Sequence, residues 1–276
     1  MATSGATARE TPGGSPPRQP LVAATATRCE GELIHAVTET LAAEVPVAMQ
    51  FNGRSHAVML ATPADLEDFA LGFAVTEGIV RRVDEVQVAA QTWTAQGVAL
   101  DIRIPEVRFA LLETRDRNLS GRTGCGLCGT STLEAAIRPV RAVDPAGPCA
   151  DLQALRAGLR RLTTLQPLND ASGALHAAAL LTTAGGFIVR EDVGRHNAID
   201  KAAGAALRAG EVPHTLLVTS RASYEVVHKA AEIGCRLVAA ISAPTALAVQ
   251  LARDAGVTLV AWARPPRLTI YAGTLS

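Results

Sequence analysis

Residues 215–262 read TLLVTSRASYEVVHKAAEIGCRLVAAISAPTALAVQLARDAGVTLVAW, and strand-like and helix-like segments alternate along this stretch. Three short runs rich in aliphatic residues predict strands, and the two segments between them have the apolar spacing of helices. A glycine, Gly234 or Gly256, follows each helical pattern at or just beyond its end. This alternation predicts an α/β fold with a largely parallel sheet. The predicted elements are strand 215–219, helix 223–233, strand 237–241, helix 245–255 and strand 257–262.

The same alternation begins upstream of this stretch. A leucine stripe predicts a helix that covers residues 152–162, and a second helix is predicted over 195–208. Between them, short apolar runs predict strands over 177–182 and 187–190. We therefore predict a C-terminal α/β domain over residues 132–276.

Residues 29–118 have a different pattern, which predicts a smaller N-terminal α+β domain. Asn52-Gly53 is a strong signal for a two-residue hairpin turn between two alternating segments. Thr62 is predicted to cap a helix, with Pro63 at its first position and Gly78 at its end. The predicted strands cover residues 45–51, 56–61, 86–93 and 98–104.

Residues 1–28 are rich in Ala, Thr, Ser, Gly and Pro. Such a segment buries too little apolar surface to offset the entropy of ordering its backbone. We expect a disordered tail here. A glycine-rich loop over residues 119–131 is predicted between the two domains.

This loop carries Cys125 and Cys128 within GRTGCGLCGTST, residues 121–132. The glycines let the backbone present both sulfur atoms to a reactant. A capping box begins at Ser131, so a helix N-terminus is expected close to the cysteines, where it would favour the thiolate form. The remaining cysteines have no Cys or His at metal-ligand spacing, so we predict no protein-bound metal. The motif indicates redox or sulfur chemistry.

Composition excludes several classes of function. The 276 residues include 26 basic and 26 acidic side chains, so no overall charge points to nucleic acid or an anionic membrane. No apolar run reaches the roughly 18 residues of a membrane span. Five cysteines, an odd number, fit a reducing compartment. We expect a cytoplasmic protein with no nucleic-acid or membrane partner.

Polar side chains follow four of the predicted strands. If the sheet is parallel there, these loops meet at one edge and present arginines, hydroxyls and helix N-termini, which bind phosphate. Glu191, Asp192, Arg195 and Arg221 could instead form a structural ion-pair network. His196 could be a general base, a hydrogen-bond donor to phosphate or a cap partner. The four loops cover residues 191–197, 220–223, 242–245 and 264–267.

Three motifs carry a resemblance to a known family. They are GCGLCG at residues 124–129, REDVGRHNAIDK at 190–201 and SAPT at 242–245. With these motifs the chain resembles the formate dehydrogenase accessory sulfurtransferases, the FdhD family, over about residues 32–271. The second motif is far more specific than the cysteine pair.

The resemblance implies a function and a fold. Proteins of that family accept sulfur from a cysteine desulfurase as a persulfide and deliver it to a molybdenum cofactor, Mo-bis(molybdopterin guanine dinucleotide), before its insertion into formate dehydrogenase. It implies that Cys125 holds the persulfide and that Cys128 assists. It also implies a cytidine-deaminase-like α/β/α sandwich and a homodimer.

Candidate cofactor-binding residues come from two sources. The resemblance implies that the stretch Trp262, Ala263, Arg264, Pro265, Pro266 and Arg267 contacts the cofactor. The strand-end loops add Arg195, His196, Arg221 and Ser223. Two other classes of function remain open: a non-catalytic chaperone that binds the cofactor, and a thiol-disulfide oxidoreductase.

Overall fold

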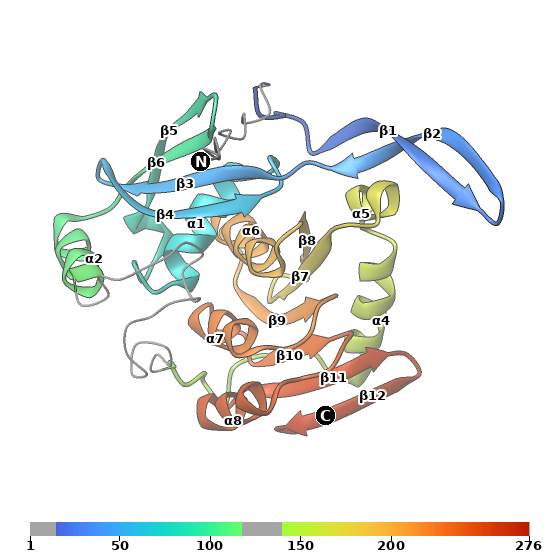
Figure 1. The fold of residues 1–276 in the computed structure, drawn as a ribbon. Coiled ribbons are helices and arrows are strands. Elements are labelled where there is room, and N and C mark those ends of the chain that lie inside the picture. Colours follow the sequence, from blue (N-terminus) through green and yellow to red (C-terminus); the bar gives the residue numbers. More distant parts are fainter. Residues whose placement is uncertain (1–14, 118–139, 276) are drawn as a thin grey trace, which may run out of the picture.

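The computed structural model describes residues 15–117 and 140–275. It has an α/β fold with two main sheets, a smaller N-terminal one and a larger C-terminal one, and a two-stranded ribbon projects from the body (Figure 1). The predicted loop with Cys125 and Cys128 lies outside the described residues, as does the helix predicted to follow it. Within the described ranges, no helix combines the length and apolar character that crossing a membrane requires.

The larger sheet has six strands in the order β12-β11-β10-β9-β7-β8. Its central strands β9, β10 and β11 are parallel, as predicted. β7 is antiparallel to both of its neighbours, and β12 is antiparallel to β11, so the sheet is mixed rather than largely parallel. The strands are β7 (His176–Thr182), β8 (Phe187–Asp192), β9 (Pro213–Val218), β10 (Leu237–Ala240), β11 (Thr258–Arg264) and β12 (Arg267–Ala272).

Helices cover both faces of this sheet. Leu216 and Leu217 are neighbours in β9, so their side chains point to opposite faces. Leu216 packs in a core with three helices, and Leu217 packs in a second core with α4. The helices are α4 (Leu152–Thr163), α5 (Pro167–Ser172), α6 (Arg195–Arg208), α7 (Tyr224–Glu232) and α8 (Ala246–Ala255). The likeness to cytidine deaminases stays a prediction, while the short helix α5 and the strand β12 were not predicted.

The helix ends agree with the glycine pattern. Gly210, Gly234 and Gly256 have φ values of 70°, 79° and 73°. In this left-handed region a glycine ends a helix without the steric cost of a Cβ atom. The three glycines therefore stop α6, α7 and α8 where the pattern predicts.

The smaller sheet has four strands in the order β4-β3-β6-β5, which confirms both predicted strand pairs. The helix after β4 begins at Leu66 rather than Pro63, because Asp65 has φ 52°. Thr62 does not cap it: its hydroxyl accepts a hydrogen bond from the Val193 amide, 3.1 Å away. The elements are β3 (Val45–Phe51), β4 (Arg54–Ala61), α1 (Leu66–Thr76), a 3-10 turn (Val83–Glu85), β5 (Gln87–Thr94), β6 (Gly97–Arg103) and α2 (Glu106–Arg117).

The predicted disordered tail is wrong for residues 21–28. They belong to β1 (Leu21–Glu30), which pairs antiparallel with β2 (Leu33–Ala42) in the projecting ribbon (Figure 1). The error has a physical cause, because β1 gains order from ten residue pairs with β2 rather than from a core of its own. Leu33 and Ile34 remain 60% and 67% exposed near the tip.

Helices α1 and α6 hold the two sheets together through an unusually close contact. A Cβ atom on Gly72 would lie 1.7 Å from the carbonyl oxygen of Asp200. Only glycine therefore permits this approach of the two backbones. Buried carboxylates at the interface pair with cations: Asp68 with Arg190 and Arg208, Asp192 with Lys201, and Asp200 with Lys229.

Candidate functional site

Four strand ends meet at one edge of the larger sheet, although the sheet is mixed. β8 is antiparallel to β7, and β7 is antiparallel to β9, so β8 points in the same direction as β9, β10 and β11. The loops that follow these strands therefore share an edge, as the sequence predicts. We name this edge, with residues 193–197, 219–223, 241–245 and 262–267, the strand-end edge.

Backbone hydrogen bonds join neighbouring loops of the strand-end edge. Ala222 forms a parallel bridge with Pro244, and its amide donates to the Ala243 carbonyl at 3.1 Å. The Trp262 amide donates to the Ser242 carbonyl, also at 3.1 Å. The loops thus extend the sheet beyond its regular strands, and these bonds fix the positions of neighbouring loops relative to one another.

Arg195 and His196 occupy the first turn of α6 at this edge. Both side chains are partly buried, and in the described part of the chain neither Arg195 Nε nor His196 Nε2 has a hydrogen-bond partner. Burial and the neighbouring Arg195 lower the pKa of His196 to about 4, against the weaker opposing effect of Glu225. His196 is therefore neutral at pH 7 and can act as a hydrogen-bond donor or acceptor.

Glu225 is a member of this site that sequence analysis missed. Its Oε2 lies 3.6 Å from His196 Nε2 and accepts a hydrogen bond of 2.7 Å from the Ser223 hydroxyl. Burial raises the pKa of Glu225, but hydrogen bonds from Ser223 and its own amide, with the charges of His196 and Arg195, bring it below the usual range. Its position two residues beyond the predicted loop, which ends at Ser223, was the signal available.

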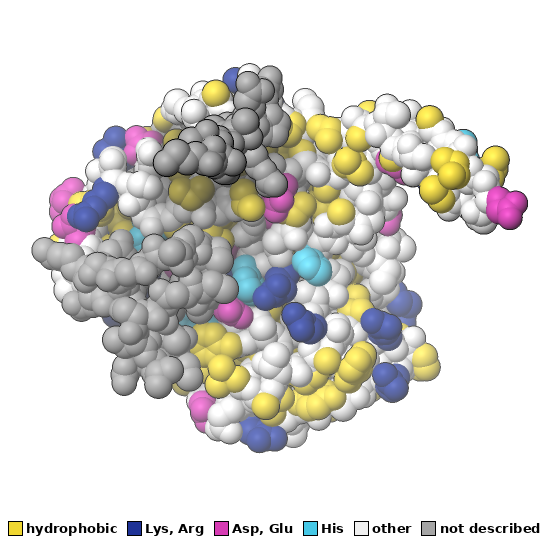
Figure 2. All heavy atoms as spheres, viewed as in Figure 1, with side chains coloured by type: hydrophobic (Ala, Val, Ile, Leu, Met, Phe, Trp, Pro, Cys, Tyr) yellow, Lys and Arg dark blue, Asp and Glu magenta, His cyan; other side chains and the backbone are white. Residues whose placement is uncertain are grey.

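His176 lies at the same edge, because β7 begins where β8 ends. His176 is directly opposite Asp192 in the strand register. Burial and the charge of Arg195 lower the pKa of His176, while Asp192 opposes them. Figure 2 shows histidine and Lys or Arg side chains gathered near the centre of the displayed face, over the region where Figure 1 draws β7, β8, β9 and the start of α6.

The predicted cofactor-binding stretch 262–267 lies where β11 turns into β12. Trp262 has φ 51°, a strained value for a non-glycine residue, within an irregular part of the β11–β12 pairing. The guanidinium carbon of Arg267 lies 5.9 Å from the centre of the Trp262 ring. Ala263 is buried and packs in the core beneath, so it supports the site without reaching it. Arg264, Pro265, Pro266 and Arg267 are exposed.

The structural ion-pair network considered as an alternative does not form. Glu191 accepts hydrogen bonds from the backbone amides of Leu168 and Asn169, at 3.0 and 2.7 Å, and so caps α5. Asp192 pairs with Lys201 at 2.6 Å. Both acids therefore leave Arg195 without a carboxylate partner. Among the described residues, the arginines at the strand-end edge that form no ion pair are Arg195, Arg221, Arg264 and Arg267.

The described cysteines lie apart from the strand-end edge in the sequence. Cys29, Cys149 and Cys235 are free, and burial raises the pKa of the Cys235 thiol. Neither described range contains a group of three His, Cys, Asp or Glu side chains that could hold a metal ion.

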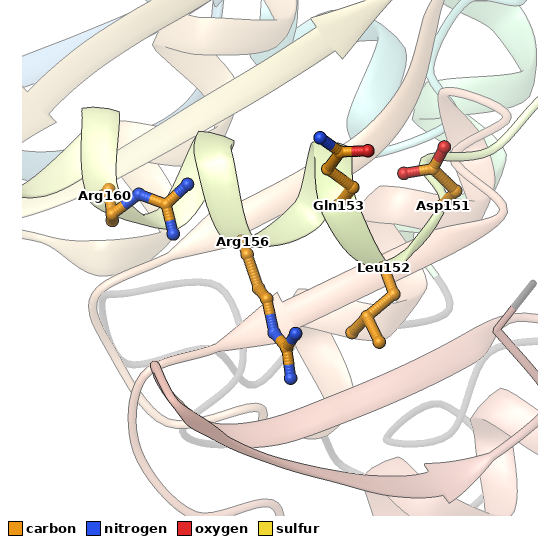
Figure 3. Close-up of a pocket in the computed structure, with 5 residues that line it drawn as sticks. All are labelled: Asp151, Leu152, Gln153, Arg156 and Arg160. Carbon is orange, nitrogen blue, oxygen red and sulfur yellow. The ribbon is translucent and has the colours of Figure 1, made fainter.

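An open depression of about 640 Å³ lies along α4, on the face of the sheet opposite α6. Figure 3 shows Arg156 and Leu152 extending from the same side of the helix, with Arg160 one turn away from Arg156. None of the predicted site residues lines this depression. It is a separate feature from the strand-end edge.

Comparison with known proteins agrees with this architecture. The model of the FdhD/NarQ family matches residues 42–275. The sulfur carrier protein FdhD of Cupriavidus necator is 49% identical over 248 residues, which are 88% of this chain and 84% of that protein. The sulfur carrier protein FdhD of Variovorax paradoxus is 46% identical over 234 residues, 84% of each protein.

A solved structure shares the fold. The crystal structure of a protein from Desulfotalea psychrophila, described as a formate dehydrogenase accessory protein, matches with a TM-score of 0.68 and 23% identity. The match covers 92% of this chain and 97% of that chain. On the family match and the two relatives, this chain belongs to the FdhD/NarQ family.

Proposed function

We propose that this protein is a sulfurtransferase that carries sulfur to the molybdenum cofactor of formate dehydrogenase. The observation that carries the proposal is the family match over residues 42–275, together with relatives named sulfur carrier proteins. The proposed donor is a cysteine desulfurase. The proposed acceptor is Mo-bis(molybdopterin guanine dinucleotide), which is a substrate here rather than a resident cofactor.

The first chemical step is a sulfur transfer to Cys125. The Cys125 thiolate attacks the outer sulfur of the donor persulfide, the donor's S–S bond breaks, and the donor cysteine leaves as a thiolate. Cys125 then holds the persulfide, and the balance of the step needs no external oxidant. Cys128, three positions further along the same loop sequence, assists as a second thiol. The glycine-rich sequence around both cysteines suits this exchange.

The strand-end edge is the proposed binding site for the acceptor. Its unpaired arginines match the diphosphate groups of a guanine dinucleotide, because guanidinium groups bind phosphate through paired hydrogen bonds. The first turn of α6 adds backbone amides that favour an anion. We assign Arg195, His196, Arg221, Ser223 and the stretch 262–267 to this site.

We further propose that the protein acts in the cytoplasm as a homodimer and delivers the cofactor to formate dehydrogenase. Apolar side chains exposed on the ribbon support a protein contact there, since Leu33, Ile34 and Leu41 are 60%, 67% and 47% exposed. Five cysteines support a reducing compartment.

Mass spectrometry after incubation with a cysteine desulfurase and cysteine tests the proposal. We expect a mass increase of one sulfur atom on the peptide that contains Cys125, and its loss on reduction with a thiol. A chaperone that only binds the cofactor gains no sulfur. A thiol-disulfide oxidoreductase forms a disulfide between Cys125 and Cys128 instead, and does not need the arginines.

A further inference from the structure

Thr62 directly follows β4, and each of its three polar groups forms a hydrogen bond with α6 or with the segment that leads into it. Its amide donates to Asp192 Oδ2 at 3.0 Å, its hydroxyl accepts from the Val193 amide at 3.1 Å, and its carbonyl accepts from Lys201 Nζ at 2.8 Å. Thr62 and Lys201 are each 0% exposed. A residue of the smaller sheet thus completes a loop of the larger one.

Asp192 is the centre of this contact. Besides Thr62, its carboxylate accepts from the Gly194 amide at 2.7 Å and from Asn197 Nδ2 at 2.9 Å, and it pairs with Lys201. Asn197 Nδ2 also donates to the carbonyl of Leu60 in β4, at 2.8 Å. Because Asp192 is 0% exposed, all these partners act in a dry interior where an unmade hydrogen bond is costly.

The hydrogen bonds of Thr62 and Asp192 fix the backbone of Val193 and Gly194, immediately before Arg195 and His196. Gly194 is the N-cap residue of α6 and has no side chain that could cap the helix. Space is tight as well, since a Cβ atom on Gly194 would lie 2.6 Å from Asn197 Nδ2. The entry into α6 is therefore determined by the bonds to Thr62 and Asp192 rather than by a conventional cap.

Thr76 offers a matched comparison in the same interface. It is also 0% exposed and also contacts a buried acid and a buried lysine, here through its hydroxyl, which donates to Asp200 Oδ1 at 2.5 Å and accepts from Lys229 Nζ at 3.0 Å. Within the described part of the chain, no hydrogen bond of the Thr76 side chain reaches residues 193–196, and Asp200 lies more than a helical turn beyond Arg195. Its loss should weaken the interface without disturbing the entry into α6.

We propose that Thr62 is a positioning residue for Arg195 and His196, so that the smaller sheet holds part of the binding site for the phosphorylated acceptor. This inference rests on the proposed function for the identity of the ligand. Thr62 does not touch that ligand; it acts through the backbone of Val193 and Gly194. The site then requires both sheets, although every arginine assigned to it belongs to the larger one.

Calorimetry with guanosine diphosphate on three variants tests the proposal. Thr62→Val keeps the shape and both backbone bonds but removes the hydroxyl, and we expect it to bind about tenfold more weakly. Thr62→Ser restores the hydroxyl and should bind as the wild type does. Thr76→Val should lower the melting temperature by a similar amount and bind normally. Normal binding by Thr62→Val, or an equal loss in Thr76→Val, would overturn the proposal.

Amide hydrogen exchange separates this inference from the proposed function. We expect faster exchange at residues 193–196 in Thr62→Val than in Thr76→Val, whether or not the nucleotide binds. If the wild type does not bind guanosine diphosphate, the proposed ligand is wrong, and the exchange rates alone decide on Thr62. Equal exchange at these residues in the two variants contradicts the positioning role. Thr62→Ala replaces Thr62→Val in both measurements if the valine variant does not fold.

Discussion

Gly204 of α6 lies so close to Asp68 of α1 that a Cβ atom on Gly204 would sit 1.9 Å from the Asp68 carbonyl oxygen. The same two helices meet again at Gly72 and Asp200. Close backbone approach thus joins the two sheets at two points, with ion pairs of buried carboxylates around them. A side chain at either glycine would push the helices apart.

We expect Gly204→Ala to lower the free energy of unfolding by about 1–3 kcal/mol, the usual cost of overpacking a filled interior. The alanine gains about 1 kcal/mol in helix propensity, but the clash is with backbone, which cannot rotate away. Urea denaturation measures the difference.

Gly158→Ala in α4 is the matched control. The nearest atoms to its Cβ would all be ends of side chains: Leu217 at 2.9 Å, and Leu181 and Phe187 at 3.5 Å. A rotamer change of Leu217 can relieve the tightest of these contacts. We expect a clearly smaller loss of stability than for Gly204→Ala. Equal losses in the two variants would show that the approach of α1 and α6 is not the cause.

The depressed pKa of His196 predicts a dependence of stability on pH. In the unfolded chain the imidazole gains a proton as the pH falls through about 6.5, whereas in the folded protein it stays neutral down to about 4. The unfolded state therefore binds more protons between these values, and stability falls as the pH is lowered through this window. One such group contributes at most about 1.4 kcal/mol per pH unit.

Comparison with His196→Gln isolates this contribution. His176 and Asp200, whose pKa values are also shifted, remain in both proteins and cancel in the difference. We expect the melting temperature of the wild type to fall more steeply between pH 7 and pH 5 than that of the variant. Parallel curves would mean that His196 does not have the low pKa.

Arg264 should contribute directly to nucleotide binding. Its side chain is exposed and forms no ion pair with the described residues, so its guanidinium is free for a phosphate. We expect Arg264→Ala to weaken the binding of guanosine diphosphate by about 1.5–3 kcal/mol, or roughly ten- to a hundredfold, in calorimetry.

Two variants control for this effect. Arg253→Ala removes an exposed arginine near the end of α8 and should leave binding unchanged. Cys125→Ala should also bind normally, because sulfur loading and nucleotide binding are assigned to different residues. Lost binding in Cys125→Ala would show that the two roles are not separate.

Cys125→Ala should abolish sulfur transfer and the activation of formate dehydrogenase, because the persulfide then has no carrier. Cys149→Ala, which removes a free and partly buried thiol elsewhere, should retain both. An activation assay in the presence of the desulfurase measures the loss. Full activity in Cys125→Ala would exclude the relay and favour the chaperone.

Local sequence patterns were sufficient to predict most elements of the larger sheet. The apolar spacing of α6, the glycines that end the helices and the polar residues after each strand are all properties of short segments. Because the carboxyl ends of aligned strands share an edge, the convergence of Arg195, Arg221 and Arg264 could also be predicted. The roles of those arginines remain predictions.

Only the tertiary structure showed that β7 is antiparallel to its neighbours, that β12 joins the larger sheet and that residues 21–28 form part of a strand. It also decided that Asp192 pairs with Lys201 rather than Arg195, and that Thr62 serves the loop at Val193 rather than the helix beside it. Thr62 and Val193 are 131 positions apart. The sequence around each residue indicates only its local secondary-structure propensity. Which distant residue becomes its hydrogen-bond partner depends on packing, burial and the need to satisfy buried polar groups.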